Sequence, residues 1–495
     1  MAPPIEVLFS MLQRTPADAL AQSFAILSPR LNPRRVGRPS RAVTLAVYVA
    51  FVALVVQAFL RQGFLVWSVG VGYILYDTAL LIFTAVQIWP LRHGARPAPP
   101  SDARSSLAII VAARNEAAVL DVTIDRLAAQ DAAPDLILIA DDGSDDATPE
   151  TLARYGLAQP ALGTISPPAP GLPSLRWLRL PHGGKARALN AAILHVDEEI
   201  VVTVDADTLL EPGAVAAMRN AFAAEPELVA ATGVIRPMCG PSLSGRLFEW
   251  FQTYEYVRNF LSRYAWQRLN GLLLVSGAFA AFRTRAVVEV GGFDPDCLVE
   301  DYELIHRLHR VAHDTGRDWQ VRVVGDALAS TDAPATLPAF LRQRRRWFGG
   351  FLQTQHWNRD MVANRHFGKL GTAMLPVKAA DTVQPIFGLT AFVILLVVLF
   401  SGRFHIVLPI LIIMAVKILV DLTFHLTSLH LYSRWTGQTK GLRFGPALAA
   451  AVLEPFSFQL FRHWGAILGW KAFLTGRETW ARQSRTAIAE VKREG

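Results

Sequence analysis

Four clusters of charged and polar residues follow one another through the middle of this 495-residue chain. They are Asp141-Asp142-Gly143-Ser144, Asp205-Ala206-Asp207, Glu300-Asp301 and Gln343-Arg344-Arg345-Arg346-Trp347. Closely spaced carboxylates repel one another unless a cation lies between them, and a divalent metal that holds a diphosphate is a common solution. Arginine side chains present planar donors that suit phosphate oxygens. The set therefore predicts a site for a nucleoside-diphosphate substrate, with Mg²⁺ or Mn²⁺ as the cofactor.

Each cluster also has a purely structural explanation. Val111-Ala112-Ala113-Arg114-Asn115-Glu116 ends one predicted strand and could hold a nucleoside, but helix capping explains much of it. Asp142 could accept hydrogen bonds from a base or ribose, or belong to an acidic turn. Lys185 follows two glycines at a helix start, where an anion is favoured and where an ordinary cap is equally expected.

The last two clusters leave the same choice open. Asp301 precedes an amphipathic helix, so it is either a general base or a helix cap. Three arginines beside an apolar region could bind anionic lipid head groups. The adjoining Gln343 and Trp347 favour a shaped sugar site, because Trp347 offers a stacking face and a hydrogen-bond donor.

Alternating β-rich and amphipathic segments surround these clusters and predict an α/β domain with a largely parallel sheet. The predicted strands are Leu107–Ala112, Leu136–Ala140, Ile200–Val204 and Val229–Ile235. The predicted helices are Glu116–Ala129, Lys185–His195 and Pro212–Ala223. Ligands of such sheets bind beyond the carboxyl ends of the strands. Asp141-Asp142 and Asp205-Ala206-Asp207 each end a strand, so we expect both to face one crevice.

The composition indicates a membrane protein, because 52% of residues are hydrophobic and 18% are charged. Ala42–Leu60, Phe64–Trp89, Val383–Phe400 and Phe404–Leu426 are apolar runs long enough to cross a bilayer. Residues 445–473 are ambiguous, because Glu454-Pro455 and Arg462-His463 interrupt them.

The net charge of +8 lies largely beside the apolar runs, with arginines at 30, 34, 35, 38 and 41 before the first run and more basic residues after the last. Basic residues that flank spans mark the cytoplasmic side. We therefore expect a bacterial-type inner (plasma) membrane protein with several spans, a cytoplasmic catalytic domain and no nucleic-acid partner. Cys239 and Cys297 lack a metal-ligand spacing and fit a reducing compartment.

Lys417, Asp421 and His425 recur at intervals of four residues within a predicted span and share one helix face. Charges inside a membrane mark either a pathway or an ion pair. A Lys417–Asp421 pair is the simpler interpretation, with Asp77 as a further partner.

With these residues together, the chain resembles the membrane-embedded family 2 glycosyltransferases, which include the poly-N-acetylglucosamine, chitin-oligosaccharide, hyaluronan and cellulose synthases. The likeness runs from the α/β block into the first membrane segment after it. It rests on the clusters above, on Val275-Ser276-Gly277-Ala278-Phe279 and Val290-Gly291-Gly292-Phe293-Asp294, and on the Gln-x-x-Arg-Trp signature.

The resemblance implies a GT-A type, Rossmann-like nucleotide-diphospho-sugar transferase domain flanked by transmembrane helices. It also implies roles for individual residues, namely nucleotide contacts for Ala113, Glu116, Asp142 and Lys185, metal and diphosphate contacts for Asp205 and Asp207, the general base for Asp301, and acceptor and diphosphate contacts for Gln343, Arg346 and Trp347.

The expected domains are a cytoplasmic amphipathic segment (1–41), two transmembrane helices (42–89), a linker (90–105), the transferase domain (106–350), interfacial helices (351–382), a membrane region (383–473) and a basic tail (474–495). The expected function is inverting transfer from a UDP-sugar to a growing glycan, similar to that of poly-N-acetylglucosamine synthases. One alternative adds a single sugar to a lipid acceptor. Another is a nucleotide-sensing transporter or scaffold. Membrane lipid is an expected partner, and accessory or export subunits stay open.

Overall fold

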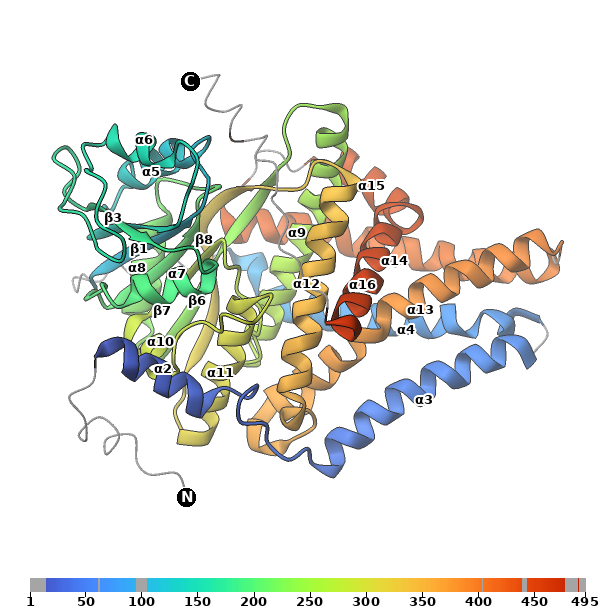
Figure 1. Cartoon of the computed structure of the whole chain (residues 1–495). Helices are drawn as coiled ribbons and strands as arrows, with labels where there is room; N and C mark the ends of the chain where they lie inside the picture. Colours follow the sequence, from blue (N-terminus) through green and yellow to red (C-terminus); the bar gives the residue numbers. More distant parts are fainter. Residues whose placement is uncertain are drawn as a thin grey trace.

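The computed structural model describes residues 15–60, 63–94, 105–402, 404–438, 443–476 and 488. An α/β domain lies at one side, and long helices extend from it toward the other (Figure 1). Most of the predicted linker and the basic tail beyond Gly476 lie outside the described residues.

The centre of the α/β domain is an eight-stranded mixed sheet in the order β3-β2-β1-β4-β7-β6-β8-β5. Its strands are β1 (Leu107–Ala113), β2 (Leu136–Asp142), β3 (Leu175–Leu180), β4 (Ile200–Asp205), β5 (Thr208–Leu210), β6 (Leu228–Met238), β7 (Phe279–Arg283) and β8 (Gln320–Asp332). β1, β2 and β4 are almost wholly buried, as expected for parallel strands covered on both faces.

The four predicted strands are confirmed as β1, β2, β4 and β6, each with slightly different ends. The prediction of a largely parallel sheet is only half right. β7 pairs antiparallel with both β4 and β6, and β5 pairs antiparallel with β8. β7 occupies the centre of the sheet because the chain returns through the long helix α9 (Leu243–Gln267) before it forms this strand.

The remaining helices of the domain cover the sheet or connect its strands. They are α5 (Leu120–Ala128), α6 (Thr148–Ala153), α7 (Lys185–Ile193), α8 (Ala214–Ala224), α10 (Thr284–Glu289), α11 (Glu300–Thr315) and α12 (Leu337–Trp357). The helices predicted from 116, 185 and 212 are confirmed as α5, α7 and α8, although α5 begins four residues later than predicted. The predicted end of the transferase domain at residue 350 falls inside α12.

Four helical segments are long and apolar enough to cross a membrane, namely Arg38–Leu60, Leu65–His93, Leu370–Phe400 and Phe404–Thr436. They contain the helices α3 (Arg38–Leu60), α4 (Ser68–Ile88), α13 (Leu375–Phe400) and α14 (Phe404–Thr436). The range expected to hold interfacial helices, residues 351–382, ends inside α13, because a π-helical turn at Leu370–Met374 leads directly into that helix.

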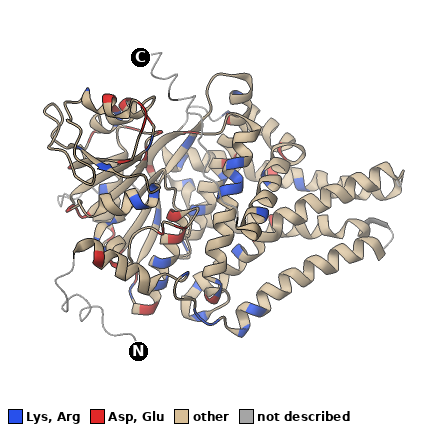
Figure 2. Ribbon diagram, in the orientation of Figure 1, with Lys and Arg blue, Asp and Glu red and all other residues tan. Residues whose placement is uncertain are grey.

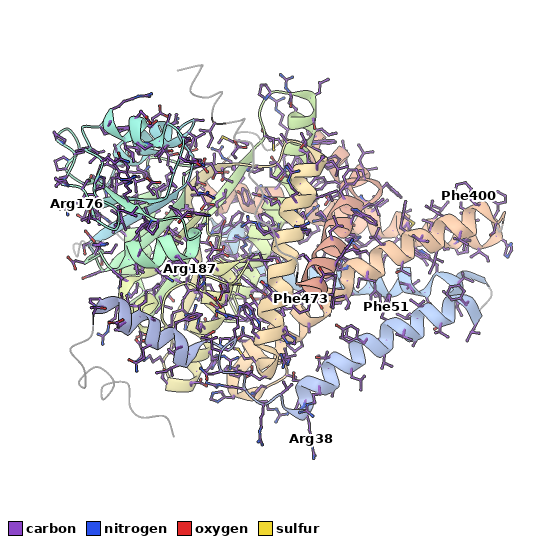
Figure 3. The ribbon with its side chains drawn as sticks, viewed as in Figure 1. Arg38, Phe51, Arg176, Arg187, Phe400 and Phe473 are labelled. Atoms are coloured by element: carbon purple, nitrogen blue, oxygen red, sulfur yellow. The ribbon has the colours of Figure 1, made fainter. Side chains whose placement is uncertain are left out.

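Charged side chains are sparse on the helices that extend away from the α/β domain (Figure 2). Phe51 on α3 and Phe400 at the end of α13 lie on this extension (Figure 3). Phe400 is 84% exposed, as is Phe59. Large apolar side chains with such high exposed fractions indicate a surface that contacts lipid.

The last two helices, α15 (Phe444–Leu453) and α16 (Phe458–Thr475), belong to a bent pair that would provide one further span if it crosses. α16 packs along α12 and runs across the direction of α13 and α14 (Figure 1). Glycines make this close packing possible, because a Cβ at Gly469 would lie 2.8 Å from Cβ of Phe348.

Candidate active site

The carboxyl ends of β2, β1 and β4 form one edge of the sheet, and the strand register places the predicted residues along it. Ala113 pairs with Asp141 across β1 and β2, and Ala112 pairs with Asp205 across β1 and β4. Asp141 itself is buried and accepts hydrogen bonds from the Ser144 backbone N–H (2.9 Å) and the Trp177 indole N–H (3.3 Å). Its role is therefore to shape the end of β2.

The turns after β1 and β2 are joined by hydrogen bonds. Asn115, with a φ of 57°, accepts a hydrogen bond from the Asp145 N–H (2.8 Å), and its own N–H donates to Ser144 Oγ (3.0 Å). The N–H of Glu116 donates to Thr148 Oγ1 (3.2 Å), and the Glu116 side chain is buried. These hydrogen bonds join the two turns at the place where the nucleotide was predicted to bind.

Asp142 holds the loop that leads to Lys185. Its carboxylate accepts hydrogen bonds from the backbone N–H groups of Gly183 (2.7 Å) and Gly184 (2.9 Å) and lies 2.8 Å from His182 Nδ1. Gly184 has a φ of 95°, a conformation that favours glycine. Asp142 thus fixes the start of α7, and a direct nucleotide contact by Asp142 stays a prediction.

Lys185 brings together acidic residues that are distant in the sequence. Its Nζ lies 2.6 Å from Asp205 Oδ1 and 3.4 Å from Glu300 Oε1. Burial alone would lower the pKa of Lys185, but the charges of Asp205 and Glu300 raise it above the ordinary value. An ammonium group therefore neutralises the carboxylates at this edge of the sheet.

Asp301 lies beside the same cluster, on the first turn of α11. Its carboxylate accepts hydrogen bonds from the backbone N–H groups of Gly277 (2.6 Å) and Tyr302 (2.8 Å). Burial, followed by the charge of Glu300, raises the pKa of Asp301 to about 6, while Lys185 acts in the opposite direction. A carboxyl group with this pKa can exchange a proton near neutral pH.

Gly277 is required for this arrangement. A Cβ at this position would lie 2.8 Å from Asp301 Oδ2, so any other residue would push the carboxylate away from its N–H donor. The Ser276-Gly277 segment leads into β7, which explains why its sequence motif belongs with the acidic clusters.

Asp207 lies in the turn between β4 and β5, as a metal-binding pair requires. It is buried, and its carboxylate accepts a hydrogen bond from Thr331 Oγ1 at 3.4 Å. Within the described parts of the chain, no group of three or more His, Cys, Asp or Glu has metal-site geometry. Mg²⁺ is commonly held by one or two carboxylates together with substrate phosphates, so two carboxylates suffice in principle, and the assignment of Asp205 and Asp207 to a metal stays a prediction.

Two residues of the cluster Gln343-Arg344-Arg345-Arg346-Trp347 have clearly different surroundings. Arg344 binds Glu255 through two hydrogen bonds (2.8 and 2.7 Å) and lies over the ring of Trp347. Gln343 is buried, and its Oε1 has no hydrogen-bond partner among the residues described. Arg344 is therefore part of the scaffold, and a ligand contact by Gln343 stays a prediction.

Arg263 is a candidate site residue that the sequence pattern did not indicate. It lies on α9, two of its guanidinium nitrogens are buried without a partner in the described structure, and burial lowers its pKa to about 10. The Asp301 charge acts on it in the opposite direction. The available signal was an arginine inside the apolar run Phe260-Leu261-Ser262-Arg263-Tyr264, which by itself resembles an ordinary surface position.

Two family descriptions match overlapping parts of the chain. "Glycosyl transferase family 2" matches residues 108–291, and "Glycosyl transferase family group 2" matches residues 200–419. Together they cover the sheet, the four sequence clusters and most of the two later spans.

Curated relatives include the poly-beta-1,6-N-acetyl-D-glucosamine synthase of Staphylococcus aureus (strain COL), which is 27% identical over 296 residues, or 60% of this chain and 65% of that protein. The synthase of the same name from Staphylococcus epidermidis is 27% identical over 246 residues, which cover 49% of this chain and 54% of that protein. The chain therefore matches less than two thirds of the length of these relatives.

A solved structure of the mannosyltransferase PcManGT from Pyrobaculum calidifontis, in complex with GDP-Man and Mn²⁺, has a TM-score of 0.51 to this chain. It is 19% identical and covers 78% of this chain and 98% of its own, a level of likeness that speaks for the fold alone. The expected GT-A, Rossmann-like fold is confirmed. The chain belongs to the family 2 glycosyltransferases, as a glycosyltransferase whose GT-A domain is joined to helices of membrane-spanning length.

Proposed function

We propose that this glycosyltransferase moves a sugar from a UDP-sugar to a growing glycan, with inversion at the anomeric carbon, as a polysaccharide synthase of the poly-N-acetylglucosamine type. The observation that carries the proposal is the contact of Lys185 with both Asp205 and Glu300, next to Asp301. This cluster combines a cation for a diphosphate with a carboxyl group suited to remove a proton.

In the proposed reaction, an acceptor hydroxyl oxygen attacks the anomeric carbon while the bond from that carbon to the diphosphate oxygen breaks. Asp301 takes the hydroxyl proton, and the nucleoside diphosphate leaves with the bonding electrons. Lys185 and Arg346 stabilise the negative charge that develops on the leaving group. A divalent metal held by Asp205 and Asp207 would neutralise further diphosphate charge when bound.

The donor and acceptor would occupy different sides of this cluster. Ala113, the last residue of β1, and Glu116, in the turn that follows, would contact the nucleotide, with Asp142 ordering the loop before Lys185. Gln343 and Trp347 on α12 would contact the acceptor, since Gln343 has an unused amide oxygen and an indole stacks well on a sugar.

We place the catalytic domain on the cytoplasmic side of a plasma membrane, with several spans. The basic residues before α3 support this orientation, because arginines that flank a span favour the cytoplasm. The path of α16 along α12 supports an interfacial position for the bent C-terminal pair, which would give four spans.

The transporter alternative draws on the charges inside α4 and α14, and ion pairing now accounts for those residues. Lys417 lies 2.6 Å from Asp77 and also contacts Asp421, so the pairing predicted from the sequence is confirmed. His425, the third residue on that helix face, lies 3.4 Å from Arg258.

UDP release from a panel of UDP-sugars, measured with the purified protein in detergent, tests the proposal. One sugar should support release that depends on Mg²⁺ or Mn²⁺ and stops on chelation. Sizing the product separates the acceptor classes, because a ladder of long glycans indicates a synthase and one discrete glycolipid indicates single transfer. No release with any nucleotide sugar would contradict the proposed chemistry.

A further inference from the structure

The N-terminal arm, which we define as residues 16–34, lies against the outside of the α/β domain. It consists of α2 (Pro16–Leu27) and the segment that leads toward the first span (Figure 1). Helix α2 contacts α10 and the loop that joins α10 to α11. We call residues 290–298 the glycine loop, because it contains Gly291 and Gly292.

An ion pair fastens the arm to the glycine loop. Arg30 makes two hydrogen bonds of 2.9 Å to the carboxylate of Asp294, which is fully buried, and lies 3.0 Å from Asp296. A buried carboxylate that loses its partner is costly, so Arg30 is needed to keep Asp294 in this position. The same carboxylate accepts a hydrogen bond from the Asp296 N–H (2.9 Å), which ties the ion pair to the backbone of the loop.

The loop lacks side chains where the arm crosses it. A Cβ at Gly291 would lie 2.2 Å from the backbone nitrogen of Phe24, and one at Gly292 would lie 3.4 Å from a methyl group of Leu20. Both glycines have positive φ values, of 89° and 70°. Because these two positions have no side chain, the backbone of α2 can approach the backbone of the glycine loop closely.

The glycine loop also holds helix α7. Asn190 accepts a hydrogen bond from the Phe293 N–H (2.7 Å) and donates one to the Phe293 carbonyl (2.8 Å). α7 begins at Lys185, so this double contact connects the loop to the residue that pairs with Asp205.

Helix α11 is fastened to the loop in the same way. Arg307 is fully buried and donates to the carbonyls of Val290 (2.5 Å) and Gly292 (2.7 Å), while it pairs with Glu303. Its guanidinium also lies over the ring of Phe24 on the arm. The helix that carries Asp301 thus contacts both the loop and the arm.

We propose that the N-terminal arm positions the active site, with Arg30 and Asp294 as positioning residues that set Lys185 relative to Asp301 through the glycine loop. The proposal rests on the proposed function, which gives Lys185 and Asp301 their roles. The arm leads through residues 35–37 into α3, whose Ser40 donates a hydrogen bond to the Arg359 carbonyl (2.5 Å).

The test compares Arg30→Ala with Arg34→Ala in the full-length protein. Arg34 is a matched control, because it lies on the same arm but binds Asp314, a partly exposed residue near the far end of α11. Misplacing reacting groups by about 1 Å costs up to roughly a hundredfold in rate. We expect Arg30→Ala to lower kcat about tenfold or more with little change in donor KM, and Arg34→Ala to stay within about twofold of the unchanged protein.

Two further measurements separate positioning from a loss of folding. Arg30→Lys, which keeps the charge but not the paired hydrogen bonds, should restore part of kcat. Hydrogen exchange at the Phe293 and Asp296 amides should accelerate in Arg30→Ala and not in Arg34→Ala, because these amides are held by Asn190 and Asp294.

Equal kcat values and equal exchange in the two alanine variants would overturn the proposal. So would a uniform loss in which KM, kcat and the melting temperature change together and Arg30→Lys restores nothing. Exchange does not depend on turnover, so it still tests the arm if the unchanged protein transfers no sugar, an outcome that would count against the proposed function alone.

Discussion

Lys185 Nζ and Asp205 Oδ1 lie 2.6 Å apart, and this ion pair joins the start of α7 to the end of β4. The same ammonium reaches Glu300 at the start of α11. One cation therefore connects three elements that the chain contributes separately. Its removal would leave several carboxylates close together without a counter-charge, which is unfavourable.

Lys185→Gln should weaken binding of UDP, because the diphosphate loses a charged donor beside Asp205. We expect the dissociation constant to rise about ten- to a hundredfold, in line with a charge-assisted hydrogen bond worth roughly 1.5–3 kcal/mol. Isothermal titration with UDP and Mg²⁺ measures this. Arg187→Gln, two residues along α7 and exposed to solvent (Figure 3), is the control and should bind normally. Equal affinities for the two variants would contradict the role of Lys185.

Asp301→Asn should abolish most transfer while UDP binding persists. The amide keeps the size of the side chain but cannot take the acceptor proton, and loss of such a base costs about 10²- to 10⁴-fold. Single-turnover transfer and UDP titration of the same sample measure the two properties. Near-normal turnover in the purified variant would remove Asp301 from the proposed mechanism.

The pH profile of transfer should show an acid limb near pH 6. The pKa of Asp301 is raised to about 6, so the group holds its proton below that pH and becomes an active base above it. Activity should fall about tenfold per pH unit below the limb. Lys185 lowers the pKa of Asp301, so Lys185→Gln should move the limb to higher pH. A limb that moves to lower pH, or does not move, would be inconsistent with this electrostatic coupling.

Arg344 and Arg346 should respond differently to substitution by alanine. Arg344→Ala leaves Glu255, which is 3% exposed at its side chain, with Arg462 at 3.5 Å as its remaining ion-pair partner among the described residues, so the melting temperature should fall. Arg346→Ala should lower transfer with a smaller change in melting temperature. Thermal unfolding in detergent and transfer assays on both variants decide this. If Arg346→Ala lowered the melting temperature and Arg344→Ala lowered transfer alone, Arg346 would be the structural residue and Arg344 the one that serves transfer.

Lys417→Met should destabilise the helices that extend from the domain. The substitution leaves Asp77 and Asp421 close together without their shared cation. Breaking a buried ion pair costs roughly 3–5 kcal/mol, and the cost is smaller here because the two carboxylates are partly exposed. Asp77→Asn is the matched control, because it leaves Lys417 and Asp421 balanced and should have a much smaller effect. Thermal unfolding in detergent compares the two. Equal stability would mean that the pair does not hold α4 to α14.

Strands with uninterrupted apolar runs were predictable from the sequence, because β1, β2, β4 and β6 are buried and need such residues. Charged residues interrupt β3 at Arg176 (Figure 3) and Arg179 and interrupt β8 at Arg322, and β5 is only three residues long, so none of these strands has a long continuous apolar signal. The antiparallel place of β7 in the middle of the sheet depends on pairing with β4 and β6, which lie far from it in sequence.

The sequence by itself determined which residue types the site contains and that the chain has apolar segments of spanning length, because both are properties of local composition and spacing. Only the tertiary structure decided how those residues divide between roles. Asp141 and Arg344 have the same local chemistry as their neighbours, yet each is held by a distant partner, Trp177 and Glu255 respectively. The Lys185–Asp205 and Arg30–Asp294 pairs join segments that come together only when the sheet and its covering helices pack, since an ion pair depends on distance in space and not on distance along the chain.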